Sequence, residues 1–176
     1  NWLTLENGTL EYKRTNPNSD FTISTVTPFT IASTAGLWVD FRGTRNVLIA
    51  NSNSDNNDLF LNGKLTVVNG KVYVGPINTP NNNNDIEYAG GGASAIDVRG
   101  GQLVVNGQIR RNPSSASGML KYSQSGGDVI INGRNANTTN AKLEVLNSGS
   151  AFNMSGGTLR LVRGGGGNAF GDLYLR

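Results

Sequence analysis

The chain has 176 residues, with 15 Lys and Arg against 12 Asp and Glu and neither Cys nor His. The lack of Cys excludes disulfides and thiolate chemistry, and the lack of His removes the side chain most used for acid–base catalysis near neutral pH. Because the basic residues are scattered and no apolar run reaches the roughly 18 residues of a membrane span, we expect no nucleic-acid partner and no membrane insertion.

Short alternating segments follow one another along the whole chain. The apolar fraction of 36% and the charged fraction of 15% are both low, while Gly is abundant at 24 residues and Asn is frequent. Such a composition favours many tight turns between short strands. Period-2 alternation predicts an all-β chain with strands at 2–5, 21–23, 38–41, 65–67, 143–145, 159–161 and 173–175.

The strands recur at a loose period that favours a parallel β-helix. We align the units on one apolar residue of their first strand, which gives Trp38, Phe60, Ile96, Leu120, Leu143 and Leu173. The steps are 22, 36, 24, 23 and 30 residues. This predicts coils of about 22–24 residues, some of them enlarged by insertions. The alternative is an antiparallel meander, because Leu65–Val74 and Leu103–Ile109 read as hairpins closed by Asn-Gly turns.

Recurrent Asn-Gly pairs are interpreted as markers of a coil corner, where left-handed backbone geometry is needed. The same alignment places Asp97, Lys121 and Glu144 on successive coils. We therefore expect them to form an exposed ladder of alternating charge that helps to fix register.

All insertions are predicted to lie along one edge of the solenoid. They are Ala50–Asp58, Gly75–Ser94, Asn112–Gly118, Asn135–Ala141 and Gly164–Gly171. Loops carried on a rigid scaffold are where binding residues concentrate, so this edge is the expected contact surface. The candidate partner-contact residues are Asn53, Asp55, Asp58, Asn83, Asp85, Glu87, Tyr88, Arg111 and Asn137.

The sequence predicts no catalytic and no metal-binding residues. In this alignment no two acidic residues of the coil body converge, apart from Asp97 and Glu144, which Lys121 separates. Asn51-x-Asn53-x-Asp55 has the alternating oxygen spacing of a calcium loop, but Asn56 and Asn62 replace its Gly and Glu. A solvated Asn/Ser loop is the favoured interpretation, and Asp85 with Glu87 is a comparably weak calcium candidate. We expect no cofactor.

Three segments carry a resemblance to a known class of proteins. They are Gly100-Gly-Gln-Leu-Val-Val-Asn-Gly107, Gly126-Gly-Asp-Val-Ile-Ile-Asn-Gly133 and Ser155-Gly-Gly-Thr-Leu-Arg-Leu161. They resemble the coils of autotransporter passenger domains and other large bacterial β-helical surface adhesins. The resemblance implies a right-handed parallel β-helix, secretion from the cell and a stalk-like or adhesive role at the cell surface. The chain shows no translocator barrel, secretion-signal domain or end cap, so no functional residue is carried over.

These observations predict one β-helical domain over residues 1–176, as a segment of a larger protein. The expected function is that of a non-catalytic extracellular adhesin module. Its partners would be adjacent coils or domains of the same surface protein, or a glycan or protein ligand. The alternative is a polysaccharide lyase or hydrolase, which would need two carboxylates about 5 to 10 Å apart in an open groove. A third hypothesis is that the bare end strands dock on neighbouring coils.

Overall fold

A computed structural model describes residues 3–16, 18–25, 27–54, 57–79, 83–90, 92, 94–133, 143–162 and 173–176. The regular elements in this part of the chain are strands, as the alternation predicts. They are β1 (Leu5–Thr15), β2 (Phe21–Thr22), β3 (Phe29–Arg42), β4 (Asn46–Ile49), β5 (Leu59–Leu61), β6 (Lys64–Asn69), β7 (Lys71–Val74), β8 (Ile86–Tyr88), β9 (Ala95–Val98), β10 (Gln102–Val105), β11 (Ile109–Arg111), β12 (Lys121–Gln124), β13 (Asp128–Ile131), β14 (Leu143–Val145), β15 (Ala151–Met154), β16 (Thr158–Leu161) and β17 (Leu173–Leu175).

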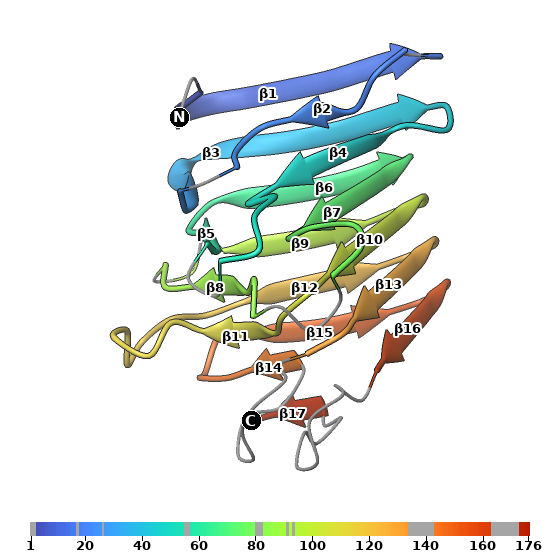
Figure 1. The fold of residues 1–176 in the computed structure, drawn as a ribbon. Helices are drawn as coiled ribbons and strands as arrows, with labels where there is room; N and C mark the ends of the chain where they lie inside the picture. The colour runs from blue at the N-terminus through green and yellow to red at the C-terminus, as the bar shows by residue number, and fades with distance from the viewer. Residues whose placement is uncertain are drawn as a thin grey trace.

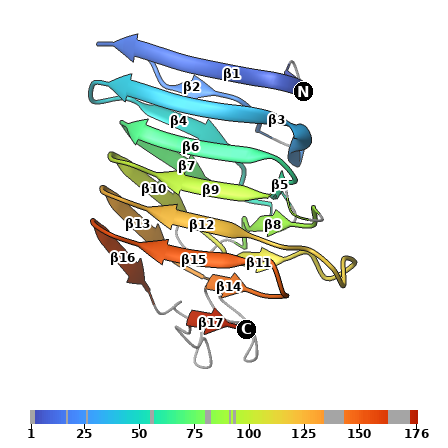
Figure 2. The same ribbon diagram turned by 180° about the vertical axis from the view of Figure 1, so that it is seen from behind.

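The strands wind into a parallel β-solenoid of about 5 turns (Figures 1 and 2). Every pairing recorded between them is parallel. The antiparallel alternative is therefore wrong. The turn at Asn69-Gly70 joins β6 to β7, which belong to different sheets, instead of closing a hairpin.

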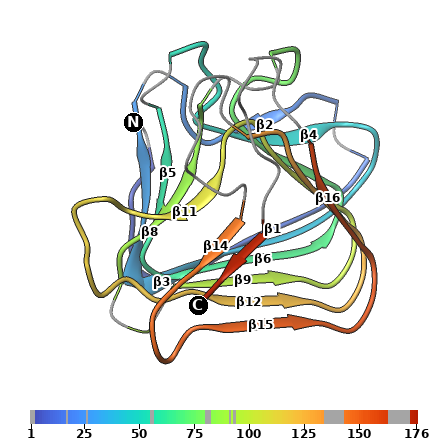
Figure 3. The ribbon, with the colours of Figure 1, turned by 90° about the horizontal axis from the view of Figure 1, so that it is seen from below.

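Each coil has three faces, which are visible along the axis in Figure 3. Face I contains β5, β8, β11, β14 and β17; face II contains β6, β9, β12 and β15; face III contains β2, β4, β7, β10, β13 and β16. The long strand β3 belongs to two faces, because its first part pairs with β5 and its second part with β6. Strand β1 runs alongside β3 over both parts.

The predicted coil length of 22–24 residues is wrong, because the coils have about 27. The alignment that produced it mixed two faces. Trp38 and Ile96 lie on face II, whereas Phe60, Leu143 and Leu173 lie on face I. Short strands on all three faces point apolar side chains inward, so their local sequences look alike although they are not equivalent.

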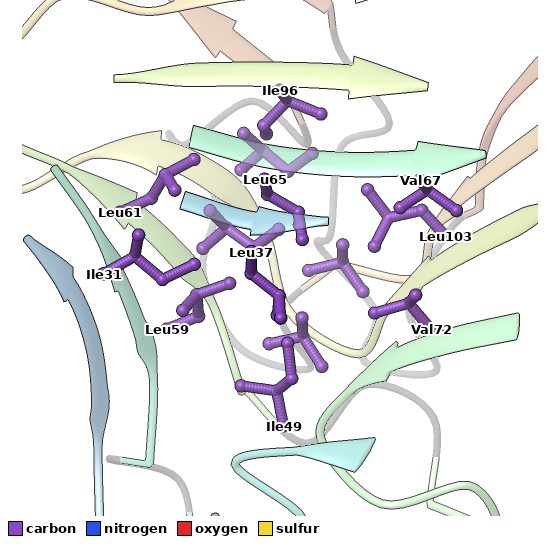
Figure 4. Packing of buried hydrophobic residues seen from close by; sticks show 14 of the residues in the cluster. Ile31, Leu37, Ile49, Leu59, Leu61, Leu65, Val67, Val72, Ile96 and Leu103 are labelled. Carbon is purple, nitrogen blue, oxygen red and sulfur yellow. The ribbon is translucent and has the colours of Figure 1, made fainter. Parts of the chain in front are cut away.

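The core consists of apolar columns that run from coil to coil. On face II one column is Leu10, Leu37, Leu65, Ile96, Tyr122 and Phe152. On face III another is Phe21, Val47, Val72, Leu103, Val129 and Leu159. Figure 4 shows the middle of this core, where Leu37, Leu65, Ile96, Val72 and Leu103 are at most 1% exposed. Burying a side chain of this size contributes about 1.5 to 3 kcal/mol.

The regular corner of the solenoid is the one between faces II and III, and a column of glycines builds it. Gly70, Gly101, Gly127 and Gly157 have φ of 87°, 65°, 69° and 81°. A Cβ on Gly101 or Gly127 would collide with the backbone of the preceding coil. Gly-Gly segments thus mark this corner from β9 onward, while Gly70 of an Asn-Gly pair marks it between β6 and β7. Asn-Gly pairs instead fall at all three corners: between β5 and β6, between β6 and β7, and after β10 and β13.

The insertions do not share one edge. Residues 50–58 and 75–85 connect face III to face I, but 89–94 and 112–120 connect face I to face II. The predicted insertion Gly75–Ser94 also contains strand β8, whose Ile86 and Tyr88 are fully buried. Its short apolar pattern was hidden between Asn-rich and Gly-rich stretches. Asn135–Ala141 and Gly164–Gly171 lie outside the described residues.

The predicted charge ladder does not form. Asp97 pairs in register with Ser123 instead of Lys121, and Glu144 lies on β14 of face I. Asp97 instead forms ion pairs with Lys64 at 3.2 Å and with Arg99 at 2.9 Å. Lys64 reaches Asp97 from the neighbouring strand β6, whereas Arg99 follows Asp97 by two residues in the chain.

Candidate functional site

A group of charged side chains joined by ion pairs lies on the outer side of face I. Arg110 of β11 is in register with Glu87 of β8. Asp85 directly precedes β8, and Asp58 directly precedes β5, the strand that pairs with β8. We call Asp58, Asp85, Glu87, Arg110 and Glu144 the acidic–arginine cluster.

Arg110 joins two carboxylates of the cluster. Its Nε lies 2.7 Å from Asp85 Oδ2, and its Nη2 donates to Glu87 Oε1 at 2.5 Å. The side chains of Arg110, Asp85 and Glu87 are 14%, 1% and 6% exposed. A buried charge needs both an opposite charge and hydrogen bonds. Arg110 supplies the opposite charge to both acids.

Hydrogen bonds from neighbouring coils complete the environment of these acids. Asp85 Oδ1 accepts from the Gln108 backbone N–H at 2.7 Å, and Asp58 Oδ1 accepts from the Asp85 backbone N–H at 2.8 Å. The second oxygen of Glu87 accepts from Asn112 Nδ2 at 2.7 Å. The cluster therefore links successive coils along face I.

The environment of the cluster shifts the pKa values of its members by different causes. Burial raises the pKa of Asp58 from 3.8 to about 7, and the charges of Asp85 and Glu87 add to the rise, while the Asp85 N–H and Arg110 oppose it. Burial also raises the pKa of Glu144, against the hydrogen bond from the Arg111 N–H and the charges of both arginines. For Arg110, burial acts to lower the pKa, but the two carboxylates outweigh it and raise the pKa.

This arrangement can hold a proton on Asp58 near neutral pH, which is what a general acid or base requires. The expectation that no acids converge is wrong, because Asp85 and Glu87 meet at one guanidinium. Their near-complete burial keeps a polymer away from them. Asp58 and Glu144 are half-buried and are the carboxyl groups of the cluster that solvent reaches most readily.

The predicted contact residues are divided between the cluster, the core and loops. Asp58, Asp85 and Glu87 belong to the cluster, and Asp55 and Asn137 lie outside the described residues. Asn53 is exposed and its Oδ1 accepts from Thr79 Oγ1 at 3.2 Å. Asn83 is half-buried in the loop before β8, with φ of 51°. Arg111 is half-buried and its Nη1 donates to Ala116 O at 3.1 Å.

Tyr88 was predicted to be an exposed contact residue, and that prediction is wrong. Its side chain is 0% exposed and points into the core from face I. The hydroxyl donates to Glu144 O at 3.1 Å and accepts from the Leu146 N–H at 3.2 Å. Burial raises its pKa to about 12. Tyr88 thus ties β8 to the coil containing β14.

Sequence reasoning missed Arg110, the residue around which the cluster forms. The available signal was the basic pair Arg110-Arg111 after the buried Ile109, since alternation places Arg110 on the outer side of the strand. Recognising its partners would have required the register of β11 with β8.

The calcium candidates receive no further support. Within the described residues, no group of three or more acidic side chains is arranged to hold a metal ion. Asn51 and Asn53 lie in the loop before β5, while Asp55 is not described. At the second candidate, Arg110 already supplies the positive charge that a bound cation would bring to Asp85 and Glu87.

Asparagine side chains organise the loops between faces III and I. Asn84 is fully buried, and its Nδ2 donates to the carbonyl oxygen of Asn57 at 2.7 Å. The same Nδ2 lies 3.3–3.4 Å from the carbonyl oxygens of Ala50, Ser52 and Ser54, to which it also donates. In the following coils, Asn106 donates to Pro76 O and Asn132 to Asn106 Oδ1. These amides bind the described parts of the loops to neighbouring backbone and side chains.

Comparison of the chain with protein-family models, curated proteins and solved structures found no match. The sequence resemblance to autotransporter passengers therefore stands on its Gly-Gly segments alone. Among the described residues, no helix is long and apolar enough to cross a membrane.

Proposed function

We propose that the chain is a non-catalytic, extracellular β-solenoid module that serves as a rigid stalk at a bacterial cell surface. The observation that carries the proposal is the unbroken stack of coils, with parallel strand pairing and buried columns on three faces. A solenoid held by nearest-neighbour coil contacts extends a surface along one axis. The proposed module winds in a right-handed sense, which is the general preference of crossover connections between parallel strands.

The proposed contact surface of this module spans face I, from the loops before β5 and β8 at the corner with face III to Arg111 at the end of β11. Asn53 is exposed there, and Asn83 and Arg111 are half-buried. The buried Asn84 side chain binds the backbone carbonyl groups on both sides of Asn53, at Ser52 and Ser54, and so supports the backbone that carries this contact residue. Amide and guanidinium groups suit the hydroxyl and carboxylate groups of a glycan, or the polar surface of a protein.

Binding of the purified chain to glycan arrays and to bacterial and host cell surfaces tests this role. The double variant Asn53→Ala/Arg111→Ala should lose most binding. Lys121→Ala changes an exposed side chain on face II and should retain binding. Binding that survives the double variant and fails with Lys121→Ala would place the contact elsewhere and refute the proposed surface.

A carbohydrate-active enzyme is the second candidate, favoured by the proton held on Asp58 beside other carboxyl groups. Its test is an assay for chain cleavage on acidic and neutral polysaccharides. Cleavage that disappears in both Asp58→Asn and Glu144→Gln would overturn the non-catalytic proposal. No cleavage by the unaltered chain, at pH values on both sides of 7, would remove the enzyme candidate.

A further inference from the structure

Basic residues that are scattered along the sequence come together on one side of the solenoid. Up to residue 99, every Lys and Arg lies on a strand of face II or at its corner with face III (Figure 3). They are Lys13 and Arg14 on β1, followed by Arg42, Arg45, Lys64, Lys71 and Arg99, and all are exposed. We call the last five the basic corner.

The strands that carry the basic corner have neighbours on both sides. In the sheets, β3 lies between β1 and β6, β6 between β3 and β9, β7 between β4 and β10, and β9 between β6 and β12. The turns between these strands, at residues 43–45, 70 and 99–101, all belong to the described residues. The exposure of these cations is therefore a property of stacked coils and does not depend on either end of the chain.

Two acids lie beneath the cations of the basic corner. Asp97 Oδ2 is 3.2 Å from Lys64 Nζ and 2.9 Å from Arg99 Nη2, and Asp40 Oδ1 is 3.9 Å from Arg42 Nε. The side chains of the two acids are 13% and 15% exposed, whereas those of the three cations are 46% to 71% exposed. The five cations outnumber these two carboxylates, and the positive charge is on the side that faces solvent.

Arg99 is held in a fixed position at this surface. Its Cζ lies 4.8 Å from the centre of the Trp38 ring, and its Nε and Nη2 donate to Asp97 Oδ2 at 3.1 and 2.9 Å. These two hydrogen bonds use two of the five N–H donors of a guanidinium group. A side chain that is already ordered loses less conformational entropy when it binds a ligand. Arg99 is therefore prepared to contact an anion.

Successive coils repeat positive charge at the spacing of neighbouring strands. Arg42 and Arg45 flank the turn from β3 to β4, Lys71 follows the turn from β6 to β7, and Arg99 precedes the turn from β9 to β10. Neighbouring strands lie about 4.8 Å apart, so these three levels span about 10 Å. The register continues from Lys71 through β10 to Asp128, whose opposite charge ends the row. A single small anion cannot contact all three levels, but an extended polyanion can.

We propose that the basic corner binds a linear polyuronate, a polysaccharide with one carboxylate on each sugar. The strand spacing is close to the length of one sugar in an extended chain, so each coil offers positive charge to one carboxylate. Arginine suits this group, because its planar fork pairs with a carboxylate. A single-stranded nucleic acid fits less well, since its bases stack on open aromatic rings and Trp38 already stacks with Arg99.

This surface is separate from the contact surface proposed on face I. It gives the module a second activity, which is attachment along its length to an acidic polysaccharide. Asn53 and Arg111 take no part in it, and the basic corner takes no part in the contacts of face I.

Titration of the unaltered chain with polygalacturonate, followed by calorimetry, tests the proposal, with neutral dextran as the reference polymer. The chain should bind polygalacturonate and not dextran. Its affinity should fall about tenfold or more between about 50 and 200 mM salt, because binding releases the counterions of the polymer. The variant Arg42→Gln/Arg45→Gln/Lys71→Gln changes exposed side chains only and should weaken binding about tenfold or more at the lower salt concentration.

The matched control is Lys121→Gln/Arg160→Gln/Arg176→Gln, which removes the same charge from exposed positions away from the basic corner. It should bind as the unaltered chain does. Equal losses in the two triple variants would indicate attraction by net charge alone and overturn the site.

Two further outcomes would also overturn the proposal. An unaltered chain that does not bind polygalacturonate at low salt would do so without reference to the folding of any variant. Tighter binding to single-stranded DNA than to polygalacturonate would overturn the choice of a polysaccharide. The double variant Asn53→Ala/Arg111→Ala should still bind polygalacturonate, so this proposal and the one for face I fail independently.

Discussion

Asp58 provides the sharpest test of the electrostatics of face I. Its pKa lies at about 7 in the folded chain, against 3.8 for the free side chain, chiefly because burial disfavours the charged form. The folded state therefore holds this proton more tightly than the unfolded state. The resulting stabilisation is complete below about pH 4 and is lost as pH rises from about 4 to about 7.

The magnitude follows from the size of the pKa difference. At about 1.4 kcal/mol for each pKa unit, a rise from 3.8 to about 7 corresponds to at most about 4 kcal/mol. The side chain is only partly buried, so we expect about 2 to 4 kcal/mol. Asp58→Asn removes the ionisation and keeps an oxygen that can accept from the Asp85 N–H, now 2.8 Å away. The variant should therefore be more stable than the unaltered chain at pH 8.

Urea denaturation at pH 4 and pH 8 measures this difference. The gain of Asp58→Asn should be about 2 to 4 kcal/mol at pH 8 and close to zero at pH 4. Asp128→Asn changes an exposed carboxylate on face III and should show little change at either pH. A gain of the same size at both pH values, or a loss at pH 8, would refute the desolvation argument.

Three further changes probe other parts of the solenoid by thermal or urea denaturation. Arg110→Ala leaves two buried carboxylates without their cation and should cost about 3 to 5 kcal/mol at pH 7, with a smaller loss at pH 4; equal losses would contradict the ion-pair role. Tyr88→Phe removes the hydroxyl that joins two coils and should cost about 1 to 3 kcal/mol; no loss would show that these hydrogen bonds contribute nothing. Gly127→Ala should cost more than Gly8→Ala, because both have positive φ but only Gly127 faces a crowding backbone. Equal costs would attribute the effect to φ alone, about 1 to 2 kcal/mol.

The all-β class and the solenoid architecture could be predicted because their signals are local. Alternation in segments such as Leu65–Val67 and Leu143–Val145 fixes which side chains point inward, whatever strand lies beside them. The Gly-Gly segments were also visible, although their role at the corner between faces II and III was assigned to Asn-Gly. The structure assigns this corner to the glycines, because Gly70, Gly101, Gly127 and Gly157 all adopt a positive φ there.

The acidic–arginine cluster could not be predicted from an alignment that mixed strands of two faces. Glu87 and Arg110 meet because parallel register places them side by side, and Asp58 reaches Asp85 through the same stacking. Tyr88 shows the converse error, since a tyrosine between Asn-rich and Gly-rich stretches reads as a loop residue but packs inside the coil.

By itself, the sequence determined the alternation of side chains within each strand, the inward apolar positions and the turn-rich connections. These features depend on each segment's own residues and on the backbone preferences of Gly and Asn. Only the tertiary structure decided which face each strand occupies, how many residues make a coil and which charges meet. Those properties depend on contacts between residues more than twenty positions apart, and three faces with the same inward pattern give no local signal to tell them apart.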